Sequence, residues 1–279
     1  MDFLKKKEEF LFKVRTSKII RIFAYPYMNY KRVVDKKMYS QTSDSEYIRS
    51  LKDSRKGKRC FIIGNGPSLN VKDLEKLKGE DTFAFNRIYY LFDRTVWRPT
   101  YYMCVDVGVL GMNLPTIEKL DLPNIILSDI ARKSVKNQAE NIHYLFDFSR
   151  FKVNRWGFDK PYISEEVSDH FCFCFTVTYD AIQLAIYMGY SEIYLLGVDH
   201  NYSVKADSKG HIIKDETVKD YFEGLEKTAI TAMNYEATTA AFEAARKYCD
   251  AHGIVIKNAT RGGKLDVFER VNFDTVIQS

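Results

Sequence analysis

The stretch from Arg59 to Leu69, RCFIIGNGPSL, constrains the fold more than any other part of the sequence. Its apolar run has no alternation, which is typical of a strand covered by helices on both faces of a parallel sheet. Glycine then allows positive φ and close approach of backbone N–H groups to a ligand, and proline suits a first helical turn. A strand ending in such a turn predicts a nucleotide site, although a purely structural turn also fits. The residues of this turn are Gly64, Asn65, Gly66, Pro67 and Ser68.

The same order of strand, turn and helix repeats along the rest of the chain. We expect further strands at 81–85, 101–106, 124–128, 193–196 and 254–257, and helices at 71–77, 176–189 and 236–252. Residues 131–170 are the least regular stretch and are expected to form connections. The pattern predicts an α/β fold, a Rossmann-like and mostly parallel sheet with helices on both faces.

Composition indicates a folded protein, because 46% of the 279 residues are hydrophobic and 14% are aromatic. No run of about 18 apolar residues is present, so a membrane-spanning helix is not expected, and the charged N-terminus does not resemble a secretory signal. The five cysteines predict reduced, buried thiols in a cytoplasmic protein, and without a CxxC pair or a histidine cluster we expect no zinc. They are Cys60, Cys104, Cys172, Cys174 and Cys249.

The basic charge of the chain is local. Residues 1–37 hold eleven Lys or Arg and four Asp or Glu, a balance of +7, so the remaining residues sum to −2. Two interpretations fit residues 1–25: a basic amphipathic helix on an anionic membrane surface, ending before Pro26, or a helix packed on the domain or on a subunit partner. Nucleic-acid binding is disfavoured because the charge does not spread along a domain face. We divide the chain into an N-terminal segment and linker at 1–50 and a catalytic domain at 51–279, with a lid at 201–236.

Polar residues follow several of the predicted strands. Asn65, Asn86 with Arg87, and Asp106 each follow one strand, and the strand at 193–196 is followed by Gly197 and then by Asp199, His200 and Tyr202. Because the carboxyl ends of parallel strands share one edge, we expect one crevice there. Thr176 and Thr178 begin a helix, where they either bind an anion such as phosphate or simply cap the helix.

Each polar type has a chemical role at such an edge. The asparagines can form hydrogen bonds with a ribose or a base edge, and the aspartates can bind a hydroxyl or accept a proton. His200 can act as general base toward an acceptor hydroxyl. Tyr202 can stabilise a leaving phosphate by donating its hydroxyl. Nothing in the sequence requires a metal, because the aspartates are isolated and weak ligands.

Several motifs together resemble the bacterial lipooligosaccharide sialyltransferases and the broader 6-hydroxymethylpterin pyrophosphokinase-like set, which includes domains of motility-associated flagellin glycosyltransferases. The motifs are IIGNGPSL, FNR, RPTYYMCVD, TVTYDAIQLAIYMGYSEIYLLGVDHNYS and KNAT, and they span residues 58–262.

This resemblance implies a glycosyltransferase A variant with a lid that uses a CMP-linked nonulosonic sugar with no obligatory cofactor or metal. It implies donor contacts at Asn65 and Asn86, whereas a third donor-binding asparagine is replaced by Asp106. The family's leaving-group tyrosine aligns with Asn201, next to Tyr202. The family's catalytic histidine, at the end of the lid, is replaced by the run from Met233 to Tyr235, so His200 or Asp199 would have to act as the base.

Three functions therefore stand as hypotheses. The first is transfer of a sugar from a CMP-sugar donor to a cell-surface glycan acceptor. The second is diphosphate transfer from ATP to a pterin alcohol, with Mg²⁺ held by Asp106 and Asp199. The third is nucleotide binding without catalysis, in polysaccharide assembly. A homo-oligomer is compatible with each of them.

Overall fold

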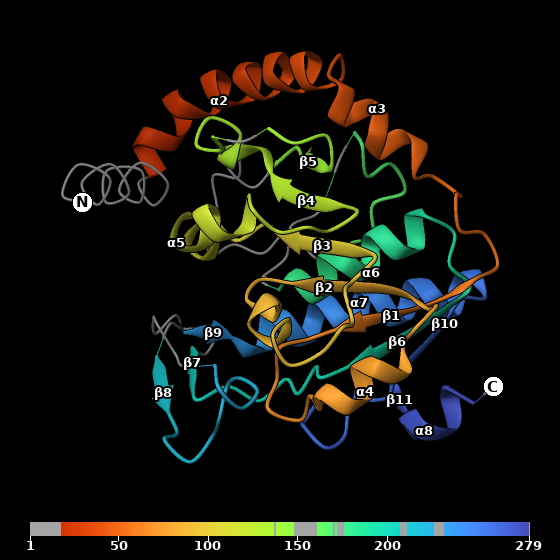
Figure 1. The fold of residues 1–279 in the computed structure, drawn as a ribbon. Coiled ribbons are helices and arrows are strands. Elements are labelled where there is room, and N and C mark those ends of the chain that lie inside the picture. The colour runs from red at the N-terminus through yellow and green to blue at the C-terminus, as the bar shows by residue number, and fades with distance from the viewer. Residues whose placement is uncertain are drawn as a thin grey trace.

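The computed structural model describes residues 18–136, 138–147, 161–169, 171, 176–206, 211–225 and 232–278, with side chains from residue 26 onward. Its centre is an eight-stranded sheet in the order β11-β10-β6-β1-β2-β3-β4-β5, in which every neighbouring pair is parallel (Figure 1). This confirms the predicted α/β class. The strands of this sheet are β1 (Arg59–Ile63), β2 (Asp81–Phe85), β3 (Tyr101–Cys104), β4 (Ile125–Ser128), β5 (Ile142–Leu145), β6 (Glu192–Leu196), β10 (Val255–Asn258) and β11 (Glu269–Arg270).

Side chains of the central strands alternate between two apolar layers. In β1, Cys60 and Ile62 enter one layer, and Phe61 and Ile63 enter the other. The first layer is completed by α3 (Ser43–Ser50), α6 (Val177–Tyr187) and α7 (Tyr235–His252). The second is completed by α4 (Val71–Lys76), α5 (Val107–Ile117) and α8 (Phe273–Val276). Both faces of the sheet are therefore covered, which explains why β1 shows no alternation in sequence.

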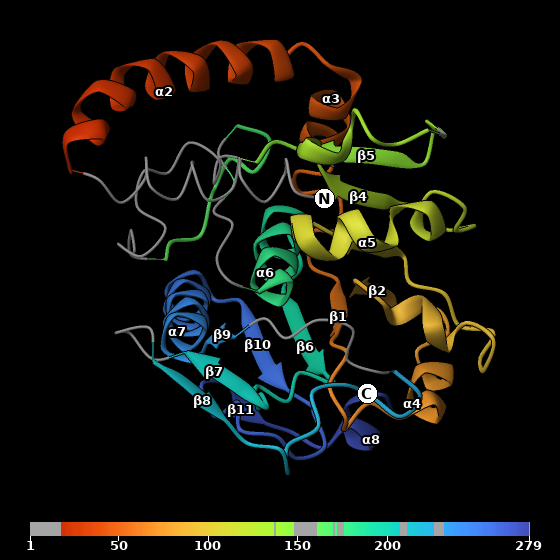
Figure 2. The same cartoon turned by 90° about the vertical axis from the view of Figure 1, so that its left-hand side faces the viewer.

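The segment predicted as a lid forms a second, small sheet. Strands β7 (Val204–Ala206), β8 (Ile212–Lys214) and β9 (Met233–Asn234) pair in the order β8-β7-β9. Figure 2 shows this sheet beside the amino-terminal end of α7, outside the main sheet. Two short 3₁₀ helices, η1 (Ile88–Leu91) and η2 (Asp129–Ala131), follow β2 and β4.

The N-terminal region differs from the sequence expectation. Helix α2 (Lys18–Tyr39) continues through Pro26, which costs one helical hydrogen bond but does not end the helix. The predicted linker at the end of the N-terminal segment contains the helix α3, whose Ile48 is fully buried, so this part of the chain belongs to the core of the domain. The remainder of the predicted N-terminal helix, residues 1–17, lies outside the described residues.

Several elements were absent from the sequence prediction, among them α5 and β5 in the main part of the fold. Helix α5 contains Gly108, Gly111 and Pro115, and strand β5 lies in the stretch expected to be irregular. In β5 the ring of His143 stacks on Tyr47 of α3, with centroids 3.4 Å apart, so α3 covers that part of the sheet edge.

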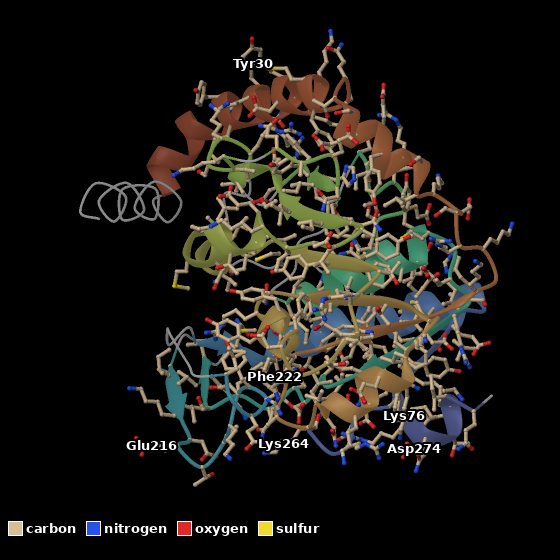
Figure 3. The ribbon with its side chains drawn as sticks, in the orientation of Figure 1. Tyr30, Lys76, Glu216, Phe222, Lys264 and Asp274 are labelled. Carbon is tan, nitrogen blue, oxygen red and sulfur yellow. The ribbon has the colours of Figure 1, made fainter. Side chains whose placement is uncertain are left out.

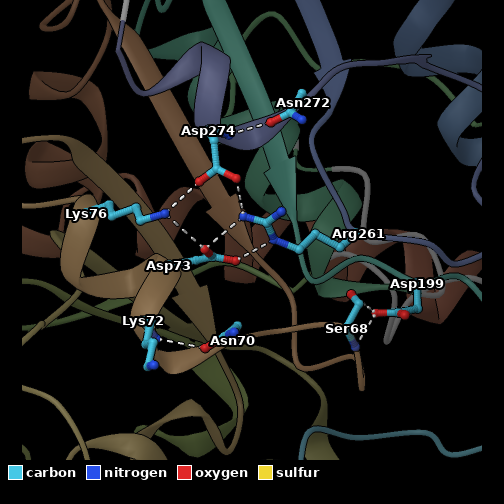
Figure 4. Close-up of polar contacts among 9 residues, drawn as sticks. All are labelled: Ser68, Asn70, Lys72, Asp73, Lys76, Asp199, Arg261, Asn272 and Asp274. Atoms are coloured by element: carbon cyan, nitrogen blue, oxygen red, sulfur yellow. Dashed lines mark hydrogen bonds and ion pairs between the residues drawn. The ribbon is translucent and has the colours of Figure 1, made fainter.

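The C-terminal residues are fastened to α4 by ion pairs. Arg261 binds Asp73 with two hydrogen bonds of 2.9 and 3.1 Å and also reaches Asp274, which in turn accepts from Lys76 (Figure 4). Of the predicted thiols, Cys60, Cys104 and Cys249 are free and buried as expected, and the other two lie outside the described residues. Within the described chain, no helix has both the length and the apolar character needed to cross a bilayer.

Candidate functional site

The glycine turn lies where the order of the sheet reverses. From β1, the chain adds β2 to β5 on one side and β6, β10 and β11 on the other. The turn after β1 and the loop after β6 are therefore adjacent, which is where parallel α/β sheets bind ligands. Gly64 N–H donates to the Leu196 carbonyl at 2.8 Å, and Gly66 N–H donates to the Gly197 carbonyl at 2.9 Å.

Glycine is required in this turn for close packing. A Cβ at Gly64 would overlap the carbonyl oxygen of Gly197, and a Cβ at Gly66 would overlap the Asp199 carboxylate. Gly197 itself has φ +69°, in the left-handed region. These residues hold two loops in contact, so the glycines have a structural role whether or not backbone N–H groups also meet a ligand. Pro67, at the tip of the turn, is exposed.

Asp199 is used by the protein itself. Its carboxylate accepts from the Ser68 hydroxyl at 2.7 Å and from the Ser68 backbone N–H at 3.4 Å (Figure 4). Burial raises the pKa of this carboxyl, and the Ser68 hydrogen bonds oppose that rise. Asp199 therefore fixes the glycine turn to the loop after β6, a role that the sequence did not indicate.

Three asparagines present carboxamide oxygens without a partner. The Oδ1 atoms of Asn65, Asn86 and Asn201 are buried, and none has a hydrogen-bond partner in the described part of the chain. The Nδ2 of Asn65 donates to the Phe85 carbonyl at 2.9 Å, which fixes its side chain at the end of β2. A buried acceptor without a donor costs on the order of 1–3 kcal/mol, so three such oxygens indicate a bound partner.

Asn86 has an unusual backbone as well. Its φ is +55°, its N–H donates to Met103, and its carbonyl accepts from the Tyr102 hydroxyl. The neighbouring strand thus holds this residue in place. The structure brings Asn65 and Asn86 to one edge, as predicted, and adds Asn201, which sequence reasoning noted only as an alignment position.

The segment predicted as a lid, called the lid below, lies against the glycine turn. Phe222 N–H donates to the Asn65 carbonyl at 3.1 Å, and the Phe222 side chain is buried in the second apolar layer. The guanidinium of Arg87 lies 4.9 Å from the centre of the Tyr221 ring, and Arg94 donates to the Glu223 carbonyl. Figure 3 shows Phe222 between the small sheet and the body of the molecule. Arg87, predicted as a ligand contact, is buried beneath the lid.

His200 is the centre of a polar and aromatic cluster. Its ring stacks on Tyr235 with centroids 4.4 Å apart, its Nε2 lies 2.8 Å from Thr239 Oγ1, and its Nδ1 lies 3.4 Å from the Tyr202 hydroxyl. Thr239 donates its hydroxyl hydrogen to the Tyr235 carbonyl. Its oxygen must therefore accept from Nε2–H, which leaves the Nδ1 lone pair facing Tyr202. His200 has a φ of +50°, in the left-handed region that asparagine also tolerates, and this backbone conformation places its ring in the cluster.

Burial changes the acid–base properties of this cluster. His200 is only 4% exposed, and desolvation, with a smaller contribution from Lys205, lowers its pKa to about 4. Burial also raises the pKa of Tyr202. The imidazole is therefore neutral at physiological pH, and its Nδ1 acts as a hydrogen-bond acceptor.

An open cleft of about 660 Å³ begins at this cluster. It runs from His200, Tyr235 and Thr239 along one side of α7. Its far part is lined by charged residues of both signs, namely Glu243, Arg246, Lys247, Asp250, Lys264 and Asp266.

Other predicted residues have capping roles. Asp106 is exposed and caps α5 by accepting from Val109 N–H at 2.8 Å, and Thr176 caps α6 by accepting from Thr178 N–H. The capping interpretation of Thr176 is thus confirmed, and its interaction with an anion stays a prediction. In the described residues, no group of three or more His, Cys, Asp or Glu side chains could hold a metal ion.

The late KNAT motif also has a clear structural role. Asn258 is fully buried, donates to the Leu265 carbonyl and accepts from Thr260 N–H. The Thr260 hydroxyl accepts from Val198 N–H at 3.1 Å. The motif therefore holds the loop that carries Asp199 and His200.

Among solved structures, the chain resembles the MAf glycosyltransferase from Magnetospirillum magneticum AMB-1, with 17% identity and a TM-score of 0.49 over 83% of this chain. It spans 38% of that protein. It also resembles the sialyltransferase CstII from Campylobacter jejuni in complex with CMP, with 18% identity and a TM-score of 0.46 over 77% of this chain and 85% of that one. A similarity of this degree says nothing about the substrate of this chain.

No curated protein sequence matches the chain. The family model described as 6-hydroxymethylpterin diphosphokinase MptE-like matches residues 36–205, which is more than half of the sequence. The match runs from the end of α2 to the start of the lid and includes the glycine turn, the Asn86 turn and the loop after β6. The chain therefore belongs to the MptE-like family.

Proposed function

We propose that the protein is a glycosyltransferase that uses a CMP-linked sugar, a nonulosonic acid by the sequence resemblance, and transfers it to a glycan acceptor. The observation that carries this proposal is the set of three buried, unpaired carboxamide oxygens at Asn65, Asn86 and Asn201. These atoms are acceptors, so the ligand must supply N–H or O–H donors to them. The amino group of cytosine and the hydroxyls of a ribose or sugar are such donors, whereas ionised phosphate oxygens are not.

The His200 cluster fits the proton transfer that the reaction needs. As the acceptor hydroxyl oxygen bonds to the anomeric carbon, the bond from that carbon to the donor phosphate oxygen breaks and CMP leaves. The acceptor proton passes to Nδ1 of His200, directly or through the Tyr202 hydroxyl, because Nδ1 carries the free lone pair. The cluster sits at the end of the lid, beside Tyr235, where the resembling sialyltransferases carry their histidine.

Two other candidate groups have different roles in this proposal. Asp199 positions the glycine turn through Ser68 and is not the base. Thr176 and Thr178, at the start of α6, are placed to meet the leaving phosphate through the positive end of the helix.

The family name gives a second candidate, diphosphate transfer from ATP to a pterin alcohol. This chemistry requires carboxylates that converge on Mg²⁺. Here Asp106 caps a helix and Asp199 binds Ser68, so both carboxylates are engaged with the protein. The geometry therefore favours sugar transfer.

The test is donor consumption. The protein is incubated with CMP-sialic acid and an oligosaccharide mixture, or with ATP, Mg²⁺ and a hydroxymethylpterin, and CMP or AMP is measured by chromatography. We expect release of CMP that depends on the oligosaccharide. Release of AMP with the pterin alone would support the second candidate instead, and the absence of both products would leave nucleotide binding without catalysis as the function.

A further inference from the structure

We infer that the outer face of α2 docks the protein on an anionic membrane surface. This goes beyond the proposed function, because it concerns a part of the molecule that does not touch the candidate site. The helix lies along one side of the domain in both Figure 1 and Figure 2. Its C-terminal end is fixed: the Tyr39 hydroxyl donates to the Tyr144 carbonyl at 2.9 Å, and the Tyr39 ring packs against Phe146.

The two sides of α2 differ in what they contact. Lys36 and Tyr39, three residues apart, face the domain, where Lys36 pairs with Asp169 at 2.6 Å. The opposite side carries Tyr27, Tyr30, Val33 and Met38, which are 66%, 69%, 56% and 65% exposed. Figure 3 shows Tyr30 pointing away from the body of the molecule. Four large apolar or aromatic side chains on one surface helix form an exposed patch that calls for a partner.

The chemistry of this face fits a lipid–water boundary. Tyrosine has an apolar ring and a polar hydroxyl, so it is favoured at the level of lipid headgroups. The exposed lysines Lys31 and Lys37 lie on this side, and Lys31 also pairs with Asp35 at 3.0 Å. Arg32 is exposed as well, but it precedes Lys36 by four residues and therefore lies on the side that faces the domain. Lysine and arginine can bury their apolar stems while their charged ends reach anionic headgroups. Residues 26–38 contain four basic residues and one acidic residue, and residues 1–37 as a whole have a net charge of +7.

A second copy of this chain fits the same face less well. Helix pairs are held by interlocking aliphatic residues at alternating spacings of three and four. The outer face of α2 instead mixes tyrosine with lysine, and two such faces brought together would place like charges side by side. Charge complementarity therefore favours an anionic bilayer over self-association.

The orientation of α2 is consistent with an acceptor that is bound to the membrane. The amino-terminal end of α2 lies on the same side of the molecule as α5 and the small sheet β7–β9, the side at which the strands end (Figure 1).

The experiment uses the full chain and flotation with vesicles of phosphatidylcholine alone or mixed with phosphatidylglycerol. We expect binding to the anionic vesicles only, and loss of binding at high salt. The double variant K31Q/K37Q should bind at least tenfold more weakly, since each basic residue near an anionic surface contributes about fivefold. The double variant Y27S/Y30S should also bind more weakly, because it loses the aromatic anchors.

The matched control is Tyr90→Ser, which removes an exposed tyrosine from η1, away from α2. It should bind vesicles like the wild type. All these variants should melt at the wild-type temperature, because the side chains are exposed. Equal binding by wild type and K31Q/K37Q would overturn the proposal. So would a dimer in light scattering that Y27S/Y30S converts to a monomer without any vesicle binding by the wild type. Neither result depends on whether the protein transfers sugar.

Discussion

Because Asn86 has a left-handed backbone, a single substitution there can change both the free energy of unfolding and the affinity for CMP. Two different substitutions separate these effects. The φ of +55° at Asn86 is tolerated by asparagine and glycine, and it is unfavourable for alanine by roughly 1–2 kcal/mol. We therefore expect Asn86→Gly to unfold like the wild type and Asn86→Ala to lose about 1 kcal/mol of unfolding free energy, while both lose affinity for CMP. Urea denaturation and calorimetry measure the two effects separately.

Asn258 provides the contrast to Asn86. Its side chain is fully buried and both ends of its carboxamide are bonded within the protein. Asn258→Ala should lower the free energy of unfolding by more than Asn86→Ala does. A stable N258A protein, or an N86G protein that unfolds early, would show that the assignment of one asparagine to ligand and the other to structure is wrong.

His200 gives a second residue-scale prediction. His200→Asn keeps a residue that tolerates positive φ but removes the Nδ1 base, so CMP affinity should stay within about twofold while turnover falls by 10²-fold or more. Because the pKa is lowered to about 4, wild-type turnover should stay constant as pH falls from 8 to 5 and decline only near pH 4. A decline centred at pH 6.5, or full turnover by H200N, would contradict the assignment.

At the scale of elements, the lid is fixed to the body by contacts that can be tested singly. The Tyr221 ring lies against the Arg87 guanidinium, an interaction worth about 0.5–2 kcal/mol. Tyr221→Ala should therefore speed proteolysis between residues 211 and 225 by about two- to thirtyfold, whereas Tyr221→Phe keeps the ring and should be cut at the wild-type rate. If both variants are cut alike, the ring does not hold the lid.

The same scale shows what the sequence can and cannot predict. Strands β1, β2 and β6 and helices α6 and α7 were predicted because long apolar runs and clear caps mark them. Helix α5 was missed because two glycines and a proline disfavour a helix locally, and packing of Leu110, Leu114 and Ile117 overrides that preference. Strand β5 was missed because its four residues acquire strand character only by pairing with β4.

The candidate site divides in the same way. Asn65, Asn86 and His200 were found because they follow strands of a parallel sheet, whose ends meet by topology. The side chains and backbone that contact these residues were not predicted, because Thr239, Tyr235 and Phe222 approach from the last helix and the lid. No local pattern reports contacts between segments so far apart in the sequence.

For the whole molecule, burial of neutral His200 makes stability depend on pH. The pKa is about 4 when folded and about 6.5 when unfolded, so below pH 6.5 the unfolded chain binds the proton more readily. This contribution to stability is complete above pH 6.5 and is lost progressively as pH falls toward 4. His143, whose pKa burial also lowers to about 4, acts in the same direction.

The contribution of His200 to this pH dependence can be measured by comparing the wild type with H200N. Between pH 7.5 and 5, the free energy of unfolding of H200N should fall by about 2 kcal/mol less than that of the wild type, because the variant lacks this proton linkage. Urea denaturation at both values measures it, with His252→Asn as a control at an exposed position. Parallel falls in wild type and H200N would show that His200 is not buried in a neutral state.

The most direct test of the account is calorimetric titration of the wild type and Asn86→Gly with CMP, and with ATP plus Mg²⁺. Among the described residues, this edge of the sheet offers three unpaired carboxamide oxygens, and Asp106 and Asp199 are both engaged with the protein, so the wild type should bind CMP more tightly than ATP with Mg²⁺. Asn86→Gly should weaken CMP binding at least tenfold, since a hydrogen bond to a buried acceptor is lost. Tighter binding of ATP with Mg²⁺, or equal CMP affinity in both proteins, would contradict the assignment of this edge of the sheet to a cytidine nucleotide.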